Sequence, residues 1–395
     1  MRKEIRIFFR SKQRGDFVQK RQMGNLKENV GLLGFGCMRL PTLSNGEIDE
    51  EEAVRIVRYG IQHGVNYLDT AYNYHQGKSE EFVGRVVKDG YREKVNIATK
   101  LPVWLVNSFE DCEKIFNEQL TRLDVETVDY YLLHALNRET WLKSKKHGVL
   151  DFLETMQKQG KIKNIGFSFH DELEVFKEIV DGYAWDFCQI QLNYMDDFYQ
   201  AGVEGLEYAA SKGLGVIVME PLRGGKLVHN VPPEVKEIFE LSGQDRSLAE
   251  WAFKWVANFP EVSLILSGMG KFEEVAENIK VLDNATPNSL SAEELSLFKQ
   301  AKKLYNERVK ISCTDCKYCL PCPQNIEIPR IFDLYNTASI YNSFSSDGWQ
   351  YKELIKKGHD GARCIECGQC EDVCPQNLKI IDTLKMAHTA FARDL

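Results

Sequence analysis

The segment NYLDTAYNY, residues 66–74, decides the fold of the first part of the chain. A short β-rich run, residues 66–69, ends in Asp69, and a polar loop carrying Tyr74 follows it. Helical patterns flank the run on both sides, with apolar faces formed by Ala53, Ile56, Val57 and Ile61 before it and by Phe82, Val83, Val86 and Val87 after it. A buried strand between two amphipathic helices predicts a repeating strand–helix unit.

The same alternation continues to about residue 290. Strands are expected at residues 31–37, 66–69, 95–100, 128–134, 163–168, 186–192, 215–220 and 262–267. Eight such runs with helices between them, over about 250 residues, match a (β/α)8 TIM barrel of the α/β class. A doubly wound sheet is the alternative, but no G-x-G-x-x-G motif opens a helix here. We therefore expect a barrel over residues 30–288.

Polar side chains end nearly every predicted strand. In chain order they are Asp69, Lys100, His134, Ser168, Gln189 or Gln191, and Glu220. The chemistry of such barrels lies at the C-terminal ends of the strands. Random surface residues would not readily place Asp, Lys and His at three consecutive strand ends. The mouth of the barrel is therefore the expected active site.

Tyr74, Lys100, Asp69 and His134 suit the reduction of a carbonyl by hydride. The carbonyl oxygen needs a proton as negative charge builds on it, and a phenol with a pKa of about 10 is a weak acid at neutral pH. An ammonium beside it favours the phenolate and lowers that pKa, and Asp69 would hold Lys100 in place. His134 can orient the carbonyl by a hydrogen bond. The alternatives are a structural ion pair, a histidine bonded to buried backbone groups and a core tyrosine.

Eight of the eleven cysteines form two runs near the C-terminus: Cys313, Cys316, Cys319 and Cys322, then Cys364, Cys367, Cys370 and Cys374. The second run reads C-x2-C-x2-C-x3-C-P, the spacing with which bacterial ferredoxins hold 4Fe–4S clusters. In that arrangement the fourth cysteine of each run ligates the other cluster. We therefore expect one cluster on Cys313, Cys316, Cys319 and Cys374, and the other on Cys364, Cys367, Cys370 and Cys322.

Other uses of these cysteines remain open. The first run has two residues, not three, before Cys322, so a single cluster is one alternative. Zinc is another, although structural zinc usually takes separated cysteine pairs. Disulfides would suit a small secreted scaffold, and no signal peptide opens this chain. Cys37, Cys112 and Cys188 are expected in the core.

Composition limits the partners. The 395-residue chain has a net charge of −8, which argues against nucleic-acid binding. No apolar run approaches the roughly 20 residues of a membrane helix. Residues 1–29 are locally basic and are expected to form a short hairpin or frayed leader. Because exposed clusters survive best in a reducing environment, we expect a cytoplasmic protein.

The chain resembles the aldo–keto reductase superfamily from about Val18 to Leu282. The resemblance rests on GFGCMRLP (34–41), YLDTAYNY (67–74), IATK (97–100), YYLLHAL (130–136), IGFSFHD (165–171), CQIQLNY (188–194) and VMEPLRGGKL (218–227). It implies that the family's catalytic tetrad falls on Asp69, Tyr74, Lys100 and His134. Together with CTDCKYCLPCP (313–323), the chain is similar to the branch with a C-terminal 4Fe–4S domain.

The resemblance also implies a nicotinamide site. The family's carboxamide-binding serine and glutamine match Ser168 and Gln189, while its asparagine position is Phe169, next to His170. Met219 stands where an aromatic residue usually stacks on the nicotinamide. The expected phosphate and adenine contacts are Gly268, Gly270, Lys271, Glu277 and Asn278. With one lysine and no arginine beside it in this segment, the cofactor is expected to be NADP(H), with NAD(H) as the alternative.

Residues 289–395 are expected to form a helical linker and a small, mainly α-helical ferredoxin-like domain. Ser291 and Glu294 predict a capping box that opens a helix through Val309. The long separation of the cysteine runs resembles the dicluster ferredoxin domain of succinate dehydrogenase-type enzymes. A helix over residues 380–391 is expected to close it.

Three functions fit this combination. The first is an NAD(P)H-dependent reductase of small aldehydes, ketones or quinones whose clusters are structural or serve docking. The second is an electron-transfer oxidoreductase, in which the clusters link a ferredoxin or flavoprotein partner to the barrel. Because hydride carries two electrons and each cluster carries one, this function would need a flavin, which no motif reveals or excludes. The third is a nucleotide-binding redox sensor without turnover.

Overall fold

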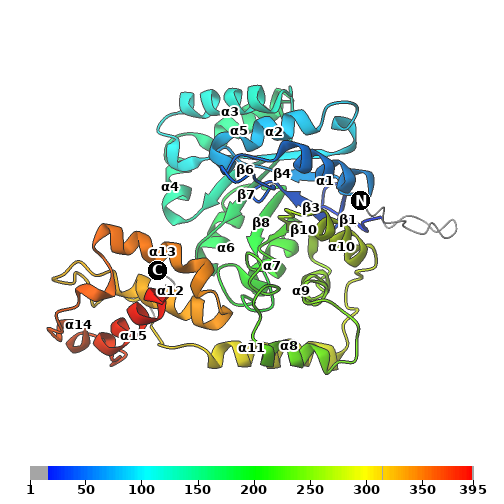
Figure 1. Ribbon diagram of the computed structural model, residues 1–395. Coiled ribbons are helices and arrows are strands. Elements are labelled where there is room, and N and C mark those ends of the chain that lie inside the picture. The colour runs from blue at the N-terminus through cyan, green and yellow to red at the C-terminus, as the bar shows by residue number, and fades with distance from the viewer. Residues whose placement is uncertain (1–16, 314, 394–395) are drawn as a thin grey trace. The chain divides into compact units, whose positions relative to one another are not determined.

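The computed structural model describes residues 17–313 and 315–393. Its centre is a closed barrel of parallel strands, as the sequence predicts (Figure 1). The strands are β3 (Leu33–Gly36), β4 (Tyr67–Asp69), β5 (Asn96–Leu101), β6 (Val128–Leu136), β7 (Ile162–Phe169), β8 (Phe187–Gln191), β9 (Gly215–Met219) and β10 (Val262–Ser267). They pair in chain order, and β10 closes the barrel against β3. The predicted fold class is confirmed.

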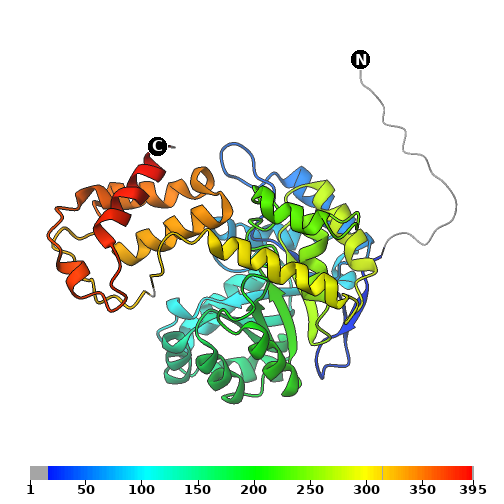
Figure 2. The same cartoon turned by 90° about the horizontal axis from the view of Figure 1, so that it is seen from below.

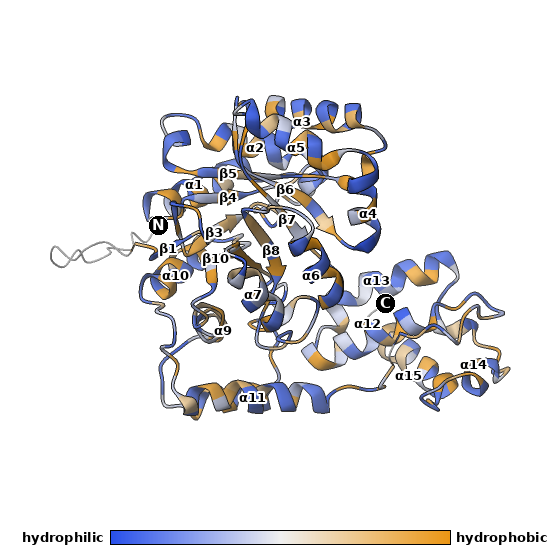
Figure 3. Ribbon diagram, turned by 180° about the vertical axis from the view of Figure 1, so that it is seen from behind, coloured by the Kyte–Doolittle hydropathy of each residue, from blue (hydrophilic) through white to orange (hydrophobic). Residues whose placement is uncertain are grey.

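Helices surround the barrel and present their apolar faces to it. They are α1 (Glu50–Gln62), α2 (Ser79–Val86), α3 (Phe109–Leu123), α4 (Arg138–Lys146), α5 (Val149–Lys158), α6 (Leu173–Asp181), α7 (Gly202–Ser211), α9 (Leu248–Ala257) and α10 (Phe272–Asp283). In Figure 3 the helices alternate between hydrophobic and hydrophilic residues, and strand β8 is largely hydrophobic. A capping box between Ser108 and Asp111 fixes the start of α3.

A hairpin closes the N-terminal end of the barrel. Strands β1 (Lys20–Gln22) and β2 (Asn29–Gly31) pair antiparallel, and Met23 between them is fully buried in the barrel interior. In the same loop Glu28 accepts a hydrogen bond of 2.9 Å from the Tyr130 hydroxyl. Polar side chains lie at the opposite end of the barrel, where the strands finish. The apolar leader residues Ile5, Ile7, Phe8 and Phe9 lie outside the described residues.

The chain divides into two compact units. The first contains residues 1–221 and 252–289, and the second contains residues 222–251 and 290–395. Residues 222–251, between β9 and the end of the barrel, therefore belong by their contacts to the unit that carries the cysteine runs. The three domain bounds expected from the sequence stay a prediction.

The second unit is helical. It holds α8 (Pro233–Glu240), α11 (Ala292–Glu307), α12 (Ile328–Tyr341), α13 (Phe344–Lys357), α14 (Gln369–Asp372) and α15 (Ile380–Ala392). The predicted capping box of Ser291 and Glu294 starts α11, the long yellow helix of Figure 2. Phe298 on this helix packs edge-on against Phe239 and Trp251 from residues 222–251.

Two ion pairs join residues 222–251 to the helices of the same unit. Lys226 contacts Asp347 at 2.8 Å, and Arg308 contacts Glu234 at 2.7 Å. Arg308 also donates to the backbone carbonyl of Ser339, which anchors α12. Among the described residues, no helix is long and apolar enough to cross a membrane.

Candidate active site and cluster-binding region

The structure brings the four predicted catalytic side chains together at the C-terminal ends of β4, β5 and β6. Lys100 is fully buried and donates to Asp69 Oδ1 at 2.7 Å and to the carbonyl of Thr70 at 2.8 Å. Its ammonium lies 3.4 Å from the Tyr74 hydroxyl, at the outer limit of a hydrogen bond. Tyr74 thus folds back over the mouth of the barrel, as the length of its loop suggests.

The charges of this cluster depend on burial. Burial lowers the pKa of Lys100, but the charges and hydrogen bonds of Asp69 and Tyr74 together outweigh it and the net pKa is raised. Burial raises the pKa of Asp69, and the Lys100 ammonium opposes that change. Lys100 is therefore held as an ammonium beside the tyrosine.

Tyr74 departs from the simplest sequence-based expectation. Its pKa is raised above the ordinary value of a phenol, because burial raises it more than the Lys100 ammonium lowers it. The ammonium acts in the expected direction but is not the largest influence. Tyr74 is therefore protonated at neutral pH, which is the form a proton donor needs.

His134 reaches the same mouth through an irregularity in β6. The pairing of β6 with β7 shifts register between Leu133 and Leu136, and Ala135 has a φ of 52°. The Ser168 hydroxyl accepts the freed N–H of Ala135 at 2.8 Å, which holds the bulge. The His134 ring lies 6.0 Å from the Tyr74 ring and 5.1 Å from the Trp104 ring, between centroids.

The imidazole of His134 is kept neutral. Burial, with the Lys100 charge as a second cause, lowers its pKa well below the ordinary value. Its buried Nδ1 has no hydrogen-bond partner within the described residues. A neutral imidazole that faces the mouth can hydrogen-bond a ligand oxygen.

The residues expected to hold a nicotinamide lie on the next three strands. Ser168 on β7 pairs in register with Gln189 on β8, and both are buried. The Gln189 amide approaches the Met219 sulfur at 3.5 Å, while its carbonyl oxygen is buried without a partner among the described residues. An unpartnered buried amide oxygen at this position suits the N–H of a carboxamide.

The residues expected to contact the phosphates and the adenine differ in their exposure and in their hydrogen bonds. Gly268 and Gly270 lie between β10 and α10, with Lys271 as the residue that precedes α10. The Gly270 N–H donates to the Glu274 carboxylate, so this helix start already holds an anion. Asn278 is buried and donates to the Ser267 hydroxyl at 3.2 Å, whereas Glu277 is exposed. Glu277 and Asn278 are thus neighbours on α10 with different exposure, and their contact with an adenine stays a prediction.

One residue of this region was missed. The side-chain carbons of Arg39, after β3, lie about 3.0 Å from where a side chain on Gly268 would begin. The Arg39 guanidinium faces Glu220 at 3.7 Å. Sequence reasoning found no arginine here because Arg39 is distant along the chain and is adjacent only through the pairing of β3 with β10. The signal in the sequence that could have indicated Arg39 was its position just after the first predicted barrel strand, residues 31–37.

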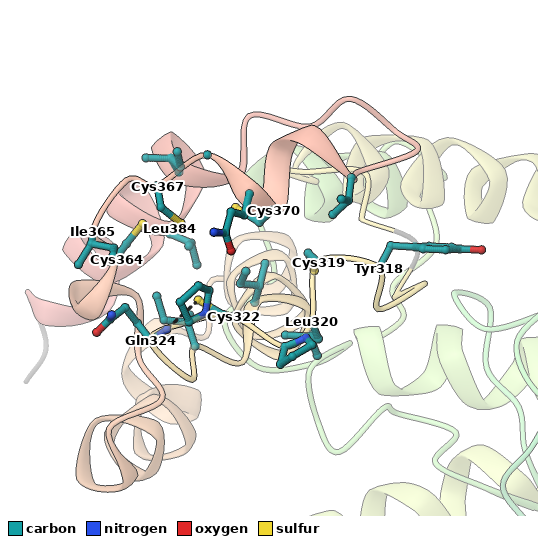
Figure 4. A pocket seen from close by; sticks show the side chains of 18 residues that line it. Tyr318, Cys319, Leu320, Cys322, Gln324, Cys364, Ile365, Cys367, Cys370 and Leu384 are labelled. Atoms are coloured by element: carbon teal, nitrogen blue, oxygen red, sulfur yellow. Dashed lines mark hydrogen bonds between the residues drawn. The ribbon is translucent and has the colours of Figure 1, made fainter.

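The eight cysteines surround two cavities of the second unit. Cys322, Cys364, Cys367 and Cys370 line a cavity of about 160 Å³, around which Figure 4 shows their side chains. Cys313, Cys316, Cys319 and Cys374 line a narrower one of about 20 Å³. Cys319 also borders the larger cavity, and Leu384 lies in its wall.

The way the thiols are grouped indicates which kind of inorganic group they could bind. Between residues 17–313 and 315–393, no three His, Cys, Asp or Glu side chains converge closely enough for one metal ion. A set of four thiols lines each of the two cavities, which matches the number of ligands of a 4Fe–4S cube.

Comparison with known proteins identifies both parts of the chain. The model of the aldo/keto reductase family matches residues 32–303. The chain belongs to the aldo/keto reductase family. A 4Fe-4S dicluster domain model matches residues 312–378 of this aldo/keto reductase. The protein is therefore an oxidoreductase of that family with a C-terminal 4Fe-4S domain.

Individual relatives agree with this assignment. The aldo/keto reductase is 26 % identical to L-galactose dehydrogenase from Arabidopsis thaliana, over 71 % of this chain and 92 % of that one. It is 26 % identical to the holo form of AKR11C1 from Bacillus halodurans, with a TM-score of 0.60 over 72 % of this chain and 96 % of that one. An aldo-keto reductase from Klebsiella pneumoniae in complex with NADPH shares the fold at 22 % identity, with a TM-score of 0.58 over 72 % of this chain and 94 % of that one.

Proposed function

We propose that the barrel reduces a small aldehyde, ketone or quinone with NADPH, with Tyr74 as the proton donor. The observation that carries the proposal is the buried Lys100 ammonium, 2.7 Å from Asp69 and 3.4 Å from the Tyr74 hydroxyl. An ion pair that served stability alone would not need a phenol aimed at it from a loop. The substrate is defined only to this class.

Each of the four side chains has its own role in this reaction. The Lys100 ammonium stabilises the phenolate that Tyr74 becomes when it gives up its proton, and Asp69 keeps Lys100 charged and in place. The neutral His134 donates a hydrogen bond that orients the carbonyl oxygen. Buried surroundings strengthen each of these interactions relative to water.

The residues that would bind the coenzyme lie at or just after the ends of the strands. A reduced nicotinamide supplies the hydride when it is bound. Ser168 and Gln189 would hold its carboxamide, and Met219 would pack on its ring. Gly268, Gly270 and Lys271 would face its phosphates, with Arg39 as an added cation that favours NADPH over NADH. Glu277 and Asn278 are the residues proposed for the adenine end.

Two 4Fe–4S clusters are proposed for the second unit. The two cavities support one cluster on Cys313, Cys316, Cys319 and Cys374 and the other on Cys364, Cys367, Cys370 and Cys322. The clusters serve structure or the docking of a ferredoxin or flavoprotein. A reducing cytoplasm is the compartment in which they would persist.

Tyr74→Phe tests the proposal. This variant removes the proton donor and keeps the ring, so we expect kcat to fall by roughly 10²- to 10⁴-fold on the best substrate of a panel of aldehydes and quinones. NADPH binding, followed by nucleotide fluorescence, should stay unchanged. Tyr208→Phe is the matched control, because Tyr208 lies on α7, where its hydroxyl donates to Asp181 at the end of α6 at 2.6 Å. Full turnover in Tyr74→Phe would contradict the assignment.

A further inference from the structure

A buried carboxylate behind the active site has no part in this mechanism. Glu80, on α2, has no exposed surface. It accepts hydrogen bonds from Thr99 Oγ1 at 2.6 Å and from Gln119 Nε2 at 2.7 Å. Arg122 Nη1 lies 3.2 Å from its second oxygen. A fully buried glutamate is rare and is retained only where several partners satisfy it.

One arm of this network reaches Lys100. The Gln119 amide N–H₂ also donates to the backbone carbonyl of Lys100 at 3.0 Å. Its carbonyl oxygen accepts the Tyr131 hydroxyl at 2.6 Å, so both ends of the amide are engaged. Because Glu80 holds Gln119 on one side, α3 and α2 together fix the end of β5 from which Lys100 projects.

The other arm reaches the loop of Tyr74. Arg122 Nη1 donates to the carbonyl of Tyr72 at 3.1 Å, and its guanidinium lies 4.3 Å from the centre of the Tyr72 ring. Just beyond Tyr74, His75 and Gln76 have φ values of 48° and 58°. Side-chain-bearing residues seldom adopt this left-handed conformation, so the loop depends on contacts that hold it.

We propose that Glu80, acting through Gln119 and Arg122, is a positioning residue that sets the distance between Lys100 and Tyr74. The ammonium and the phenol stand at the edge of hydrogen-bonding range, so a shift of either strand or loop by about 1 Å decides whether they interact. Among residues 17–313 and 315–393, Glu80 is the one side chain that accepts hydrogen bonds from both Gln119 and Arg122. The catalytic consequence rests on the proposed function, whereas the positioning itself does not.

Glu80→Gln is the first variant. The amide keeps the size of the side chain but cannot pair with Arg122, so both arms should loosen. We expect kcat to fall between about 10-fold and about 100-fold, with the dissociation constant of NADPH unchanged. Asp129→Asn is the matched control, because Asp129 is also a buried carboxylate paired with Arg92 and Lys163. It accepts from the N–H of Ile97, at the opposite end of β5.

A second readout needs no turnover. The pKa of Tyr74 can be measured by NMR of ¹³C-labelled tyrosine, with Tyr74→Phe to assign the signal. Lys100→Met should raise that pKa in the wild-type background, because it removes the cation that favours the phenolate. Asp69, Cys37 and His134 also face Tyr74. Lys100→Met also raises the pKa of Asp69, because it removes the ammonium that lowers it, and this change is common to every background.

The comparison of backgrounds decides the proposal. Lys100→Met is combined with each of the other two variants. We expect the rise in the Tyr74 pKa that it causes to be half or less of the wild-type value in the Glu80→Gln background. In the Asp129→Asn background the rise should keep its full size. An equal shift in all backgrounds would overturn the proposal and leave Glu80 a stabilising residue. If Glu80→Gln does not fold, Arg122→Lys replaces it, since Arg122 is partly exposed and lysine keeps the charge while losing the fork. A wild-type protein that reduces no carbonyl would refute the proposed function alone, because the NMR shifts would still be measured.

Discussion

At the scale of single residues, His134 ties the stability of the protein to pH. Its folded-state pKa is lowered by burial and by the Lys100 charge, whereas in the unfolded chain it is about 6.5. The unfolded state therefore binds the proton first as the pH falls. The free energy of unfolding should be unaffected by His134 above about pH 6.5 and should fall below it, by up to about 1.4 kcal/mol per pH unit.

His134→Gln isolates this effect. Urea unfolding of the wild type and the variant at several pH values between about 5 and about 7.5 gives the difference in unfolding free energy at each pH. That difference should shrink as the pH falls below about 6.5, because only the wild type carries the buried imidazole. The pKa values of His75 and His170 are also lowered by burial, and both groups are present in the two proteins. Because the His170 charge also lowers the pKa of His134, the measured difference includes this coupling. Parallel pH profiles of the two proteins would show that His134 can be protonated in the folded state.

The sequence predicted which residues meet at the mouth, but not what lies behind them. Asp69, Lys100 and His134 were found because parallel strands bring their C-terminal ends to one edge, and Tyr74 because its loop is short. Glu80 could not be found, because a glutamate on an amphipathic helix usually faces solvent. Arg39 was missed since the closure of the barrel, not the local sequence, brings it to Gly268.

At the scale of secondary-structure elements, α2 and α3 approach so closely that one glycine is essential. A side-chain carbon on Gly84 would lie 2.5 Å from the carbonyl oxygen of Leu123. Gly84→Ala should therefore force the helices apart and destabilise the protein by about 1–3 kcal/mol. Thermal unfolding would measure the change.

Gly348 on α13 is the matched control for Gly84. Apart from its own stretch of helix, no atom of the described residues would lie within 4 Å of a side-chain carbon there. Because alanine favours a helix over glycine by about 0.5–1 kcal/mol, Gly348→Ala should stabilise. Destabilisation of equal size by both substitutions would contradict the close-approach argument.

Element positions were predicted well where apolar periodicity is strong. Each predicted barrel strand is present, with ends that differ from the structure by no more than two residues, and α11 and α15 begin where their capping and apolar patterns indicate. The bulge in β6 was not foreseen, because Ala135 carries no sign of a positive φ. The occupied N-terminus of α10 was also missed, since the contact between Gly270 and Glu274 depends on the geometry of the turn.

At the scale of the whole molecule, we expect iron removal to separate the behaviour of the two units. Six of the eight cysteines pack against the apolar core of the second unit, which includes Phe332, Tyr351 and Leu384. Anaerobic chelation should therefore lower its helix content and its resistance to proteases, because metal binding contributes to folding. Carbonyl reduction at saturating NADPH should persist. The KM for NADPH should rise, since Leu222, in the second unit, lies three residues beyond Met219 along the chain.

Circular dichroism, limited proteolysis and steady-state kinetics on the same chelated sample would check this expectation. Loss of turnover in step with loss of helix would show that the barrel needs the clusters for chemistry. In that case, bleaching of the cluster absorption by NADPH in the intact protein would indicate an electron path and direct attention to a flavin.

The interleaving of the two units has a consequence for how such a protein could arise. The chain passes between the units after residues 221, 251 and 289, so the cluster-bearing part is not a pendant joined at one point. Phe239, Trp251 and the Phe298 that packs against them all lie within residues 32–303, which the barrel family's model matches. Joining a 4Fe-4S domain after residue 303 would therefore keep this contact within one part. Residues 222–251 and α11 are therefore expected to have been inherited with the barrel. Relatives that lack the cysteine runs are expected to keep the aromatic contact of Phe298.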